Sequence, residues 1–328
     1  MPFILRRLAF YVVAAWVALT ANFFLPRAMP GNAVQAILGR MPGLQPAAAQ
    51  ALEVELGIGH QGSLLSQYGK YLVDVAHFNF GTDVAQFPAS VSSLLAQTVP
   101  WTLILVGTST VIAFIVGTGL GILAGWRSGG FLDKSLPGLM FLQAIPYFFL
   151  ALILLEVFAE TFHVFPLGQG YDASSVTQGW NMPFILNAFQ HSLLPAITIV
   201  LTSVAGWMLQ MRNVMVTTVG EDYVLAAQAK GLSSRRVIGT YAARNALLPQ
   251  LQGFGLALGF VVSGALVMEI VFSYPGVGFA LLNAVTGHDY PMMQAIFLFI
   301  TFAVLIANLI VDLLIVAIDP RARAKEAR

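Results

Sequence analysis

The sequence predicts an all-α membrane protein with six transmembrane helices, and three observations carry this prediction. The chain of 328 residues is 58% hydrophobic and only 9% charged, and its mean hydropathy is +0.79, which is outside the range of soluble domains. Six apolar runs are long enough to cross about 30 Å of hydrocarbon. The basic residues gather in alternate loops, as the positive-inside rule describes for multi-span proteins.

The first apolar run follows Arg6 and Arg7 and could be mistaken for a secretory signal. Its apolar part is longer than the usual run of about 7 to 15 residues, and it lacks a small-x-small cleavage site. We therefore expect it to be retained as the first span. The six predicted spans are Leu8–Leu25, Trp101–Ala124, Leu136–Phe158, Ser192–Met211, Leu251–Phe272 and Met293–Ile318.

Thirteen of the 16 Lys and Arg residues fall on one side of these spans if the N-terminus is cytoplasmic, and only Arg27, Arg40 and Lys70 fall outside. This bias predicts that both termini are cytoplasmic. We expect a cytoplasmic tip and first span at 1–25, an extracytoplasmic loop region at 26–100, a five-helix core at 101–318 and a cytoplasmic tail at 319–328.

The extracytoplasmic loops have their own features. Ala47–Leu56 and Leu64–His77 carry apolar residues at helical spacing, and both should form short amphipathic helices. Between spans three and four, residues 161–190 contain Tyr171 and Trp180. This loop faces either the membrane surface, as an aromatic belt, or a substrate.

Gly117, Gly121 and Gly125 recur at a spacing of four in span two and therefore share one helix face. Such a stripe lets a second helix approach closely, either within this chain or across a subunit interface.

Acidic residues inside spans are costly, by about 2.5–3.5 kcal/mol at a helix centre, and so they mark functional or packing positions. Glu156 and Glu160 lie near the external end of span three, where they can reach the interface. Glu269 and Asp312 could either line a pathway or join helices by hydrogen bonds.

Residues 221–249, within the cytoplasmic coupling loop 212–249, form a polar, basic island between spans four and five. Tyr223–Lys230 can form a short helix that alanines keep thin, and Gly231 is suited to end it. Lys230, Arg235 and Arg236 add positive charge near the helix C-terminus. The segment is either a docking helix or an ordinary solvated positive-inside loop.

Motifs for catalysis are missing from the sequence. It contains no G-x-x-x-x-G-K-[ST], H-E-x-x-H or G-x-S-x-G pattern, no cysteine and no metal-ligand spacing among its five histidines. With a net charge of +1, nothing favours nucleic-acid binding. We expect no catalytic, cofactor-binding or metal site, and hence a protein that is not an enzyme.

The 221–249 island resembles the cytoplasmic EAA loop of ABC-transporter permeases, in which a short helix docks onto an ATPase subunit. Ala226, Ala227, Gly231 and the pair Leu248-Pro249 match its small-residue and Leu-Pro positions, whereas Leu225 stands where the general pattern has Glu. The resemblance implies these ATPase-coupling residues: Glu221, Tyr223, Ala226, Ala227, Lys230, Gly231, Leu232, Arg235, Arg244, Asn245 and Pro249.

The segments 268–295 and 308–321 resemble the dipeptide/oligopeptide permease family, in which a Glu precedes a Phe-Ser-aromatic-Pro-Gly-x-Gly turn and Asp-Tyr-Pro follows. Residues 67–83 are similar to the external loop of its first, B-type subunit, although Ile58-Gly59-His60 departs from the usual Leu-Asp-x-Pro. The candidates for the pathway or for helix packing are Gly117, Gly121, Gly125, Glu269, Tyr274, Pro275, Gly276 and Asp312.

The resemblance implies a type I ABC importer permease fold in a bacterial or archaeal cytoplasmic (inner) membrane. Its partners would be a second homologous permease, two ATPase subunits that bind the ATP and Mg, and an extracytoplasmic solute-binding protein. The implied cargo is di- or oligopeptides, with oligosaccharides or nickel complexes as alternatives. An ion-coupled secondary carrier that uses the intramembrane acids is the alternative from another class.

Overall fold

The computed structural model describes residues 2–28, 63–86, 88–259, 261 and 266–318. Within these ranges the regular elements are helices, and the extended pairing is limited to an isolated bridge between Thr82 and Ser90. In chain order the elements are α1 (Pro2–Ala28), α4 (Leu64–Ala76), α5 (Val91–Trp126), α6 (Phe131–Ala144), α7 (Tyr147–Leu154), the π-helical η1 (Leu155–Thr161), α8 (Met182–Val219), α9 (Asp222–Ala229), α10 (Ser234–Arg236), the π-helical η2 (Val237–Ala243), α11 (Arg244–Gly259), α13 (Leu266–Val271), α14 (Val277–Thr286) and α15 (Tyr290–Ile318).

Local sequence explains where several of these helices begin. The side chains of Ser63, Ser90 and Asn181 cap α4, α5 and α8, and each accepts a hydrogen bond from the backbone N–H three residues later. Such caps satisfy one of the four N–H groups that lack a partner in the first turn of a helix. The short polar residues therefore set the start of these elements.

Four described segments are long and apolar enough to span a membrane: Arg6–Leu25, Val91–Trp126, Met182–Val219 and Tyr290–Ile310. The predicted third span is divided into α6 and α7–η1, which are bent by 91°. Pro146 explains the break, because proline lacks an N–H and forces the extended backbone seen at Ile145. The predicted fifth span corresponds to α11 and α13 and lies partly outside the described residues, so the count of six stays a prediction.

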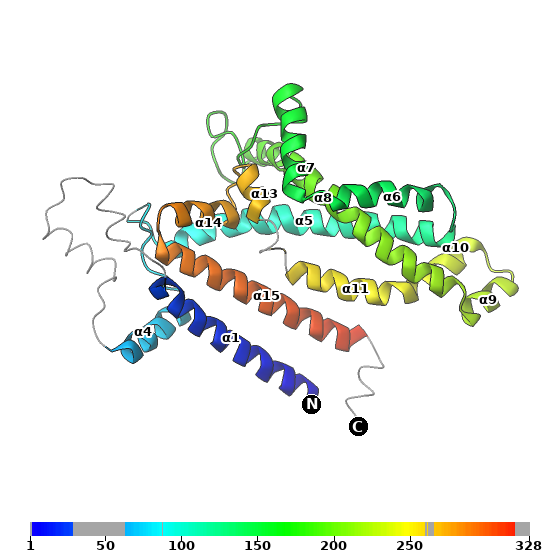
Figure 1. The fold of residues 1–328 in the computed structure, drawn as a ribbon, viewed down its shortest axis with the longest axis horizontal. Coiled ribbons are helices and arrows are strands. Elements are labelled where there is room, and N and C mark those ends of the chain that lie inside the picture. Colours follow the sequence, from blue (N-terminus) through cyan, green and yellow to red (C-terminus); the bar gives the residue numbers. More distant parts are fainter. Residues whose placement is uncertain (1, 29–62, 87, 260, 262–265, 319–328) are drawn as a thin grey trace, which may run out of the picture.

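The centre of the fold is the long pair α5 and α8, which lie side by side (Figure 1). Gly117, Gly121 and Gly125 face α8 of the same chain. A Cβ atom on Gly121 would lie 2.6 Å from both the Met208 carbonyl oxygen and the Met211 Cβ. The glycine stripe therefore lets two backbones meet within this chain, one of the two alternatives left open by the sequence.

Replacing Gly121 with leucine should separate α5 from α8, because the new side chain meets backbone that cannot move aside. We expect a destabilisation of about 3 kcal/mol, at the upper end of overpacking effects. The measurement is the midpoint of thermal unfolding in detergent. Gly119→Leu is the matched control, because a Cβ at Gly119 meets nothing within 4 Å; equal midpoints for the two variants would contradict this account.

The helices α1 and α15 form a second pair that joins the two ends of the chain (Figure 1). Near the cytoplasmic end predicted for both helices, Asp312 forms an ion pair with Arg7 and accepts a 2.7 Å hydrogen bond from the Tyr11 hydroxyl. Near the other end, the side-chain amides of Asn22 and Gln294 each donate to the other residue's carbonyl oxygen. Asp312 thus acts in helix packing.

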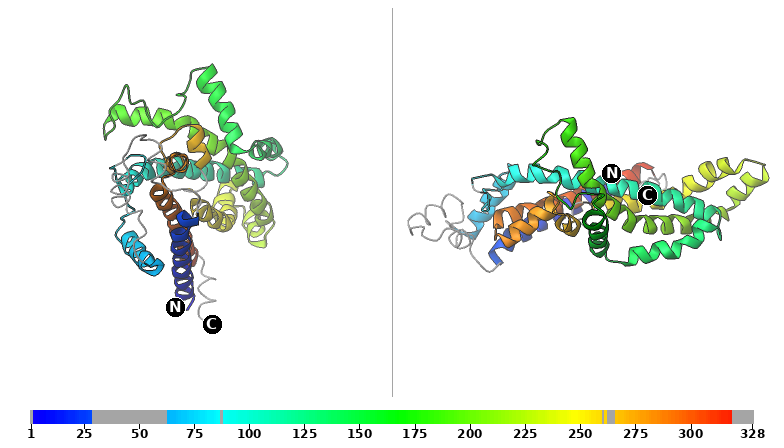
Figure 2. Two further views of the ribbon diagram at one scale, coloured as in Figure 1. Left: turned by 60° about the vertical axis from the view of Figure 1, so that its left-hand side comes forward. Right: turned by 90° about the horizontal axis from the view of Figure 1, so that it is seen from above.

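The regions predicted to lie on opposite sides of the membrane are far apart. Figure 2 shows α9 and α10 at one extremity of the molecule and α4 at the other. α4 covers most of the predicted amphipathic helix Leu64–His77, and its Tyr68 hydroxyl is 2.7 Å from that of Thr20 on α1. The other predicted external helix, Ala47–Leu56, lies outside the described residues.

Candidate functional site

The projecting segment that is predicted to be cytoplasmic is a short, firmly terminated helix. The helix α9 begins after Glu221, has Asp222 in its first turn and ends at Ala229 with Lys230 as the C-cap, one residue earlier at each end than predicted. Gly231 follows with a φ of +70°. Its N–H donates to the Gln228 carbonyl at 2.9 Å, and the Leu232 N–H donates to that of Ala227 at 3.4 Å. This pair of bonds is the Schellman motif, which requires a left-handed residue after the cap.

One face of α9 packs against its own chain. Val224 is fully buried and Ala227 is only 2% exposed. Together with the half-buried Leu232, they pack in a cluster with Met211 and Met215 of α8 and with buried residues of η2. The sequence places Ala227 among the ATPase-coupling residues, but in the structure its side chain faces inward, and its small size permits the close approach to α8 and η2.

The opposite face of α9 is open. Tyr223 is 39% exposed and Leu225 is 48% exposed, and Ala226 lies exposed beside them. Lys230, Gly231 and Arg235 continue this exposed surface beyond the helix. We call this surface, made of Tyr223, Leu225, Ala226, Lys230, Gly231 and Arg235, the docking face. It combines an apolar centre with positive charge, which suits a protein partner better than solvent alone.

Glu221 is the exposed N-cap residue of α9 and lies outside the docking face. The other three predicted coupling residues lie where the segment returns to the core. Arg244 and Asn245 are exposed in the first turn of α11, and the Asn245 amide donates to the Tyr241 carbonyl at 3.2 Å. Pro249 is exposed inside α11. These three residues lie outside the docking face.

Substitution of Gly231 should weaken the end of α9 through the backbone alone. A Cβ at Gly231 would meet nothing within 4 Å, but a φ of +70° is strained for most L residues. We expect Gly231→Val to cost at least about 1 kcal/mol locally and to lower transport, and Gly231→Asn to be milder because asparagine tolerates this conformation. Transport by both variants and their rate of digestion by trypsin after Lys230 would test whether valine has the larger effect. Equal losses for valine and asparagine would contradict this account.

A second group of hydrogen-bonded residues surrounds Glu269 on α13. The Glu269 side chain is fully buried. One carboxylate oxygen accepts a 2.6 Å hydrogen bond from the Thr102 hydroxyl of α5, and the other accepts a 2.6 Å bond from the Gly278 N–H. The Thr102 oxygen in turn accepts the N–H of Val277 at 2.8 Å. Glu269 and Thr102 together cap the N-terminus of α14, whose own N-cap, Gly276, has no side chain to do so.

The turn between α13 and α14 has room only for glycine at two positions. A Cβ at Gly276 would overlap the carboxyl group of Glu269, and one at Gly278 would lie 2.5 Å from the Cα of Leu266. Tyr274 is buried in the same turn, and its hydroxyl forms a 2.9 Å hydrogen bond with the hydroxyl of Ser192 on α8. The predicted Glu-to-Gly segment is therefore one hydrogen-bonded unit that ties α5, α8, α13 and α14 together.

The loop at 161–181, which is predicted to be extracytoplasmic, packs onto this turn. The Gln169 N–H donates to the Phe272 carbonyl at 2.8 Å, and a Cβ at Gly168 would lie 2.5 Å from that oxygen. Pro275 packs against Gly170, and Tyr171 stacks on Trp101 at a ring distance of 6.2 Å. Trp180, in contrast, is almost fully exposed.

At the start of α15, Asp289 anchors a segment from the first predicted extracytoplasmic loop. Its carboxylate accepts backbone N–H groups from Val84 at 2.6 Å, Ala85 at 3.2 Å and Met292 at 3.0 Å. Burial raises the pKa of Asp289, because desolvation disfavours the carboxylate; repulsion from Asp83 raises it further, and the three N–H groups oppose both effects. The predicted Asp-Tyr-Pro segment thus holds the backbone of Val84 and Ala85 against the start of α15.

Sequence reasoning missed Thr102 and Gly168 as members of the Glu269 unit. Thr102 is 167 residues from Glu269, and a threonine at the start of an apolar run carries no signal of its own. Pairings at such separation are visible only in the folded chain.

Known proteins resemble this chain over most of its length. Residues 117–324 match the family described as binding-protein-dependent transport system inner membrane component. A Brucella suis protein whose name describes a peptide permease is 33% identical over 92% of both chains, and a Sinorhizobium fredii protein named as a peptide ABC transporter permease is 31% identical over 98% of this chain and 99% of its own. The oligopeptide transport system permease protein AppB of Bacillus subtilis is 29% identical over 92% of both chains. This chain therefore belongs to the family of binding-protein-dependent transport system inner membrane components.

Proposed function

We propose that this chain is a membrane-spanning permease subunit of an ATP-driven importer for di- or oligopeptides. The family match and the names of the relatives support this function, and the segments around Glu269 and Asp289 that resemble peptide permeases agree with it. A second homologous permease would complete the pathway. An extracytoplasmic solute-binding protein would deliver the cargo.

The proposed coupling to an ATPase rests on one observation: α9 has one face packed against its own chain and one exposed face. Its inner face is fixed to α8 and η2, whereas its outer face presents Tyr223, Leu225 and Ala226. We propose that this face docks onto an ATPase subunit, and that two such subunits bind the ATP and Mg. A helix that is fixed on one side can transmit the movement of a partner to α8 as a rigid-body rearrangement.

The proposed orientation places both termini and α9 in the cytoplasm of a bacterium or archaeon. The bias of the basic residues supports it, as does the separation of α9 from α4. Two of the acids that an ion-coupled carrier would use are bonded within the chain, Glu269 to Thr102 and Asp312 to Arg7 and Tyr11. These contacts favour the ABC permease over the carrier.

Purification of the tagged chain from its native membrane in mild detergent tests this function. We expect an ATPase and a second permease to be recovered with it, and uptake of labelled trialanine to require ATP. Recovery of the chain alone, together with uptake that collapses when a protonophore removes the proton gradient, would favour the ion-coupled carrier instead.

A further inference from the structure

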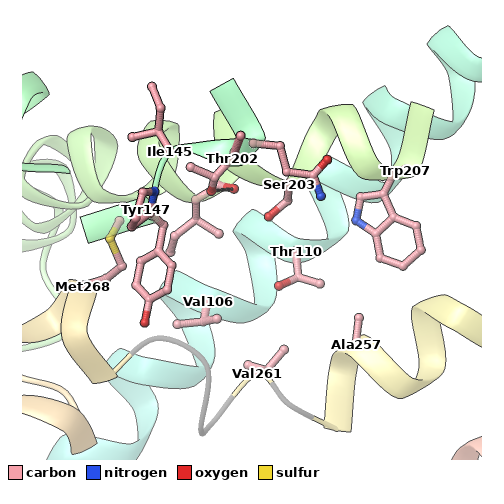
Figure 3. Close-up of a pocket in the computed structure, with 14 residues that line it drawn as sticks. Val106, Thr110, Ile145, Tyr147, Thr202, Ser203, Trp207, Ala257, Val261 and Met268 are labelled. Atoms are coloured by element: carbon pink, nitrogen blue, oxygen red, sulfur yellow. Dashed lines mark hydrogen bonds between the residues drawn. The ribbon is translucent and has the colours of Figure 1, made fainter. Parts of the chain in front are cut away.

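A cavity of about 430 Å³ lies at the break between α6 and α7. Its wall is built by α5, the break itself, α8, α11 and α13, with Val261 between the last two (Figure 3). This volume falls within the roughly 300–1,000 Å³ of small-molecule sites. The cavity is thus large enough for a short peptide segment.

The backbone at the break is itself unusual for a protein in lipid. The helix α6 ends at Ala144, and α7 begins at Tyr147 after Pro146, so the last carbonyls of α6 and the first N–H groups of α7 lack helical partners. Within a bilayer such backbone is tolerated only where it is buried in protein or lines a water-filled cavity. Ala144, Ile145 and Pro146 line this one.

Polar side chains face the same space from three directions. Thr110 belongs to α5, Gln143 and Tyr147 flank the break, and Ser203 belongs to α8. Within the described part of the chain, none of these four side chains has a hydrogen-bond partner. Figure 3 shows Tyr147 and Trp207 at opposite ends of the cavity, with Thr110 and Ser203 between them. Polar groups in membrane helices are costly unless they meet water or a ligand.

The position of Gln143 depends on a small residue across from it. A Cβ at Gly206 of α8 would lie 2.9 Å from the Gln143 side-chain nitrogen, so the amide rests over the α8 backbone. The amide offers donors and an acceptor, while the hydroxyls of Thr110 and Ser203 offer both. No Asp, Glu, Lys, Arg or His is among the described residues that line the cavity.

Uncharged donors and acceptors in pairs match the peptide group, which presents one N–H and one C=O per residue. They do not match a metal complex, which prefers charged or imidazole ligands. We propose that this cavity is a cargo subsite that binds the backbone amides of a passing peptide through Thr110, Gln143, Ser203 and the broken helix, without selecting its side chains. This inference rests on the proposed import of peptides.

The test uses the complete transporter in cells and measures initial uptake of labelled trialanine, normalised to the amount of assembled complex. The triple variant Thr110→Val, Gln143→Leu, Ser203→Ala removes the polar groups at nearly constant volume. We expect uptake to fall about tenfold or more. The matched control is Thr108→Val, on the same helix, because the Thr108 hydroxyl is exposed and donates to its own helix at Ile104.

A second variant introduces a charge where the cavity has none. Ser203→Asp should reduce uptake of Ala-Glu-Ala at least about fivefold more than uptake of Ala-Lys-Ala, because a carboxylate at this half-buried position repels one peptide and attracts the other. Each value is divided by that of the parent for the same peptide, so the preference of the binding protein cancels. A mere packing defect would affect both peptides equally.

The outcomes separate this inference from the function on which it rests. If the parent transporter imports no peptide, the peptide-import proposal fails, and the subsite fails with it. If the parent imports trialanine but the triple variant matches Thr108→Val, or if Ser203→Asp affects both charged peptides equally, the subsite alone is wrong. The subsite is established if the triple variant loses uptake while Thr108→Val does not, and if Ser203→Asp impairs uptake of Ala-Glu-Ala more than that of Ala-Lys-Ala.

Discussion

Replacing Gly276 with alanine is expected to destabilise the permease by about 3–5 kcal/mol, because overpacking costs about 1–3 kcal/mol and each buried polar group that loses its partner costs about 1–3 kcal/mol more. The added methyl group would overlap the carboxyl group of Glu269. That carboxyl group cannot turn away without losing its bonds to Thr102 and Gly278. The midpoint of thermal unfolding in detergent should fall accordingly, and the yield of assembled complex should fall with it.

Gly107→Ala is the control for this substitution, because a Cβ at Gly107, in the nearby α5, would meet nothing within 4 Å. Substitutions of Glu269 itself should destabilise the permease according to how many hydrogen bonds of the α14 cap they remove. Glu269→Leu removes both acceptors of the cap, whereas Glu269→Gln keeps one carbonyl oxygen for Gly278 and can donate to Thr102. An unfolding midpoint for Glu269→Leu that equals that of Glu269→Gln would mean that the cap contributes little.

For the glycine turn and the bent helix, the sequence pattern could be recognised, but the structure that it forms could not be predicted. The Glu-to-Gly pattern could be recognised by resemblance, but its physical reason, a carboxylate that caps α14 across the turn, depends on Thr102 from α5. Pro146 was visible in the sequence. The sharp bend at it was not, because an interior proline can leave a helix merely kinked, as the helical Pro100 of α5 illustrates.

For α9, the bounds of the helix could be predicted from the sequence, but the direction in which its side chains face could not. Helix propensity and the terminating glycine predicted α9 to within one residue at each end, because both signals are local. Which alanine faces the partner was not readable, since a small side chain suits a docking surface and a close helix contact equally well. Tertiary packing buries Ala227 in the close helix contact and leaves Ala226 exposed, where it is available for the proposed docking.

Substitution of these two neighbouring alanines by tryptophan should abolish transport by two different routes. Ala226→Trp places a large side chain on the exposed docking face, so α9 should remain folded while the ATPase is lost from the purified complex. Ala227→Trp forces the same side chain into the cluster with Met211 and Val224, where overpacking costs about 1–3 kcal/mol or more. In that variant, α9 itself should detach from α8 and η2.

Limited digestion of the permease without its ATPase distinguishes the two routes, because Lys230, Arg235 and Arg236 are trypsin sites at the end of α9. Ala227→Trp should be cut faster than the parent, whereas Ala226→Trp should be cut at the parental rate and differ only in its failure to retain the ATPase. If Ala226→Trp retained the ATPase and supported transport, the outer face of α9 could not be the docking surface. If Ala227→Trp resisted trypsin like the parent, the packing of Ala227 would not be what fixes α9 to α8 and η2. The proposed transmission of movement from the ATPase to α8 would then lose its basis, because a loosely attached helix cannot transmit it.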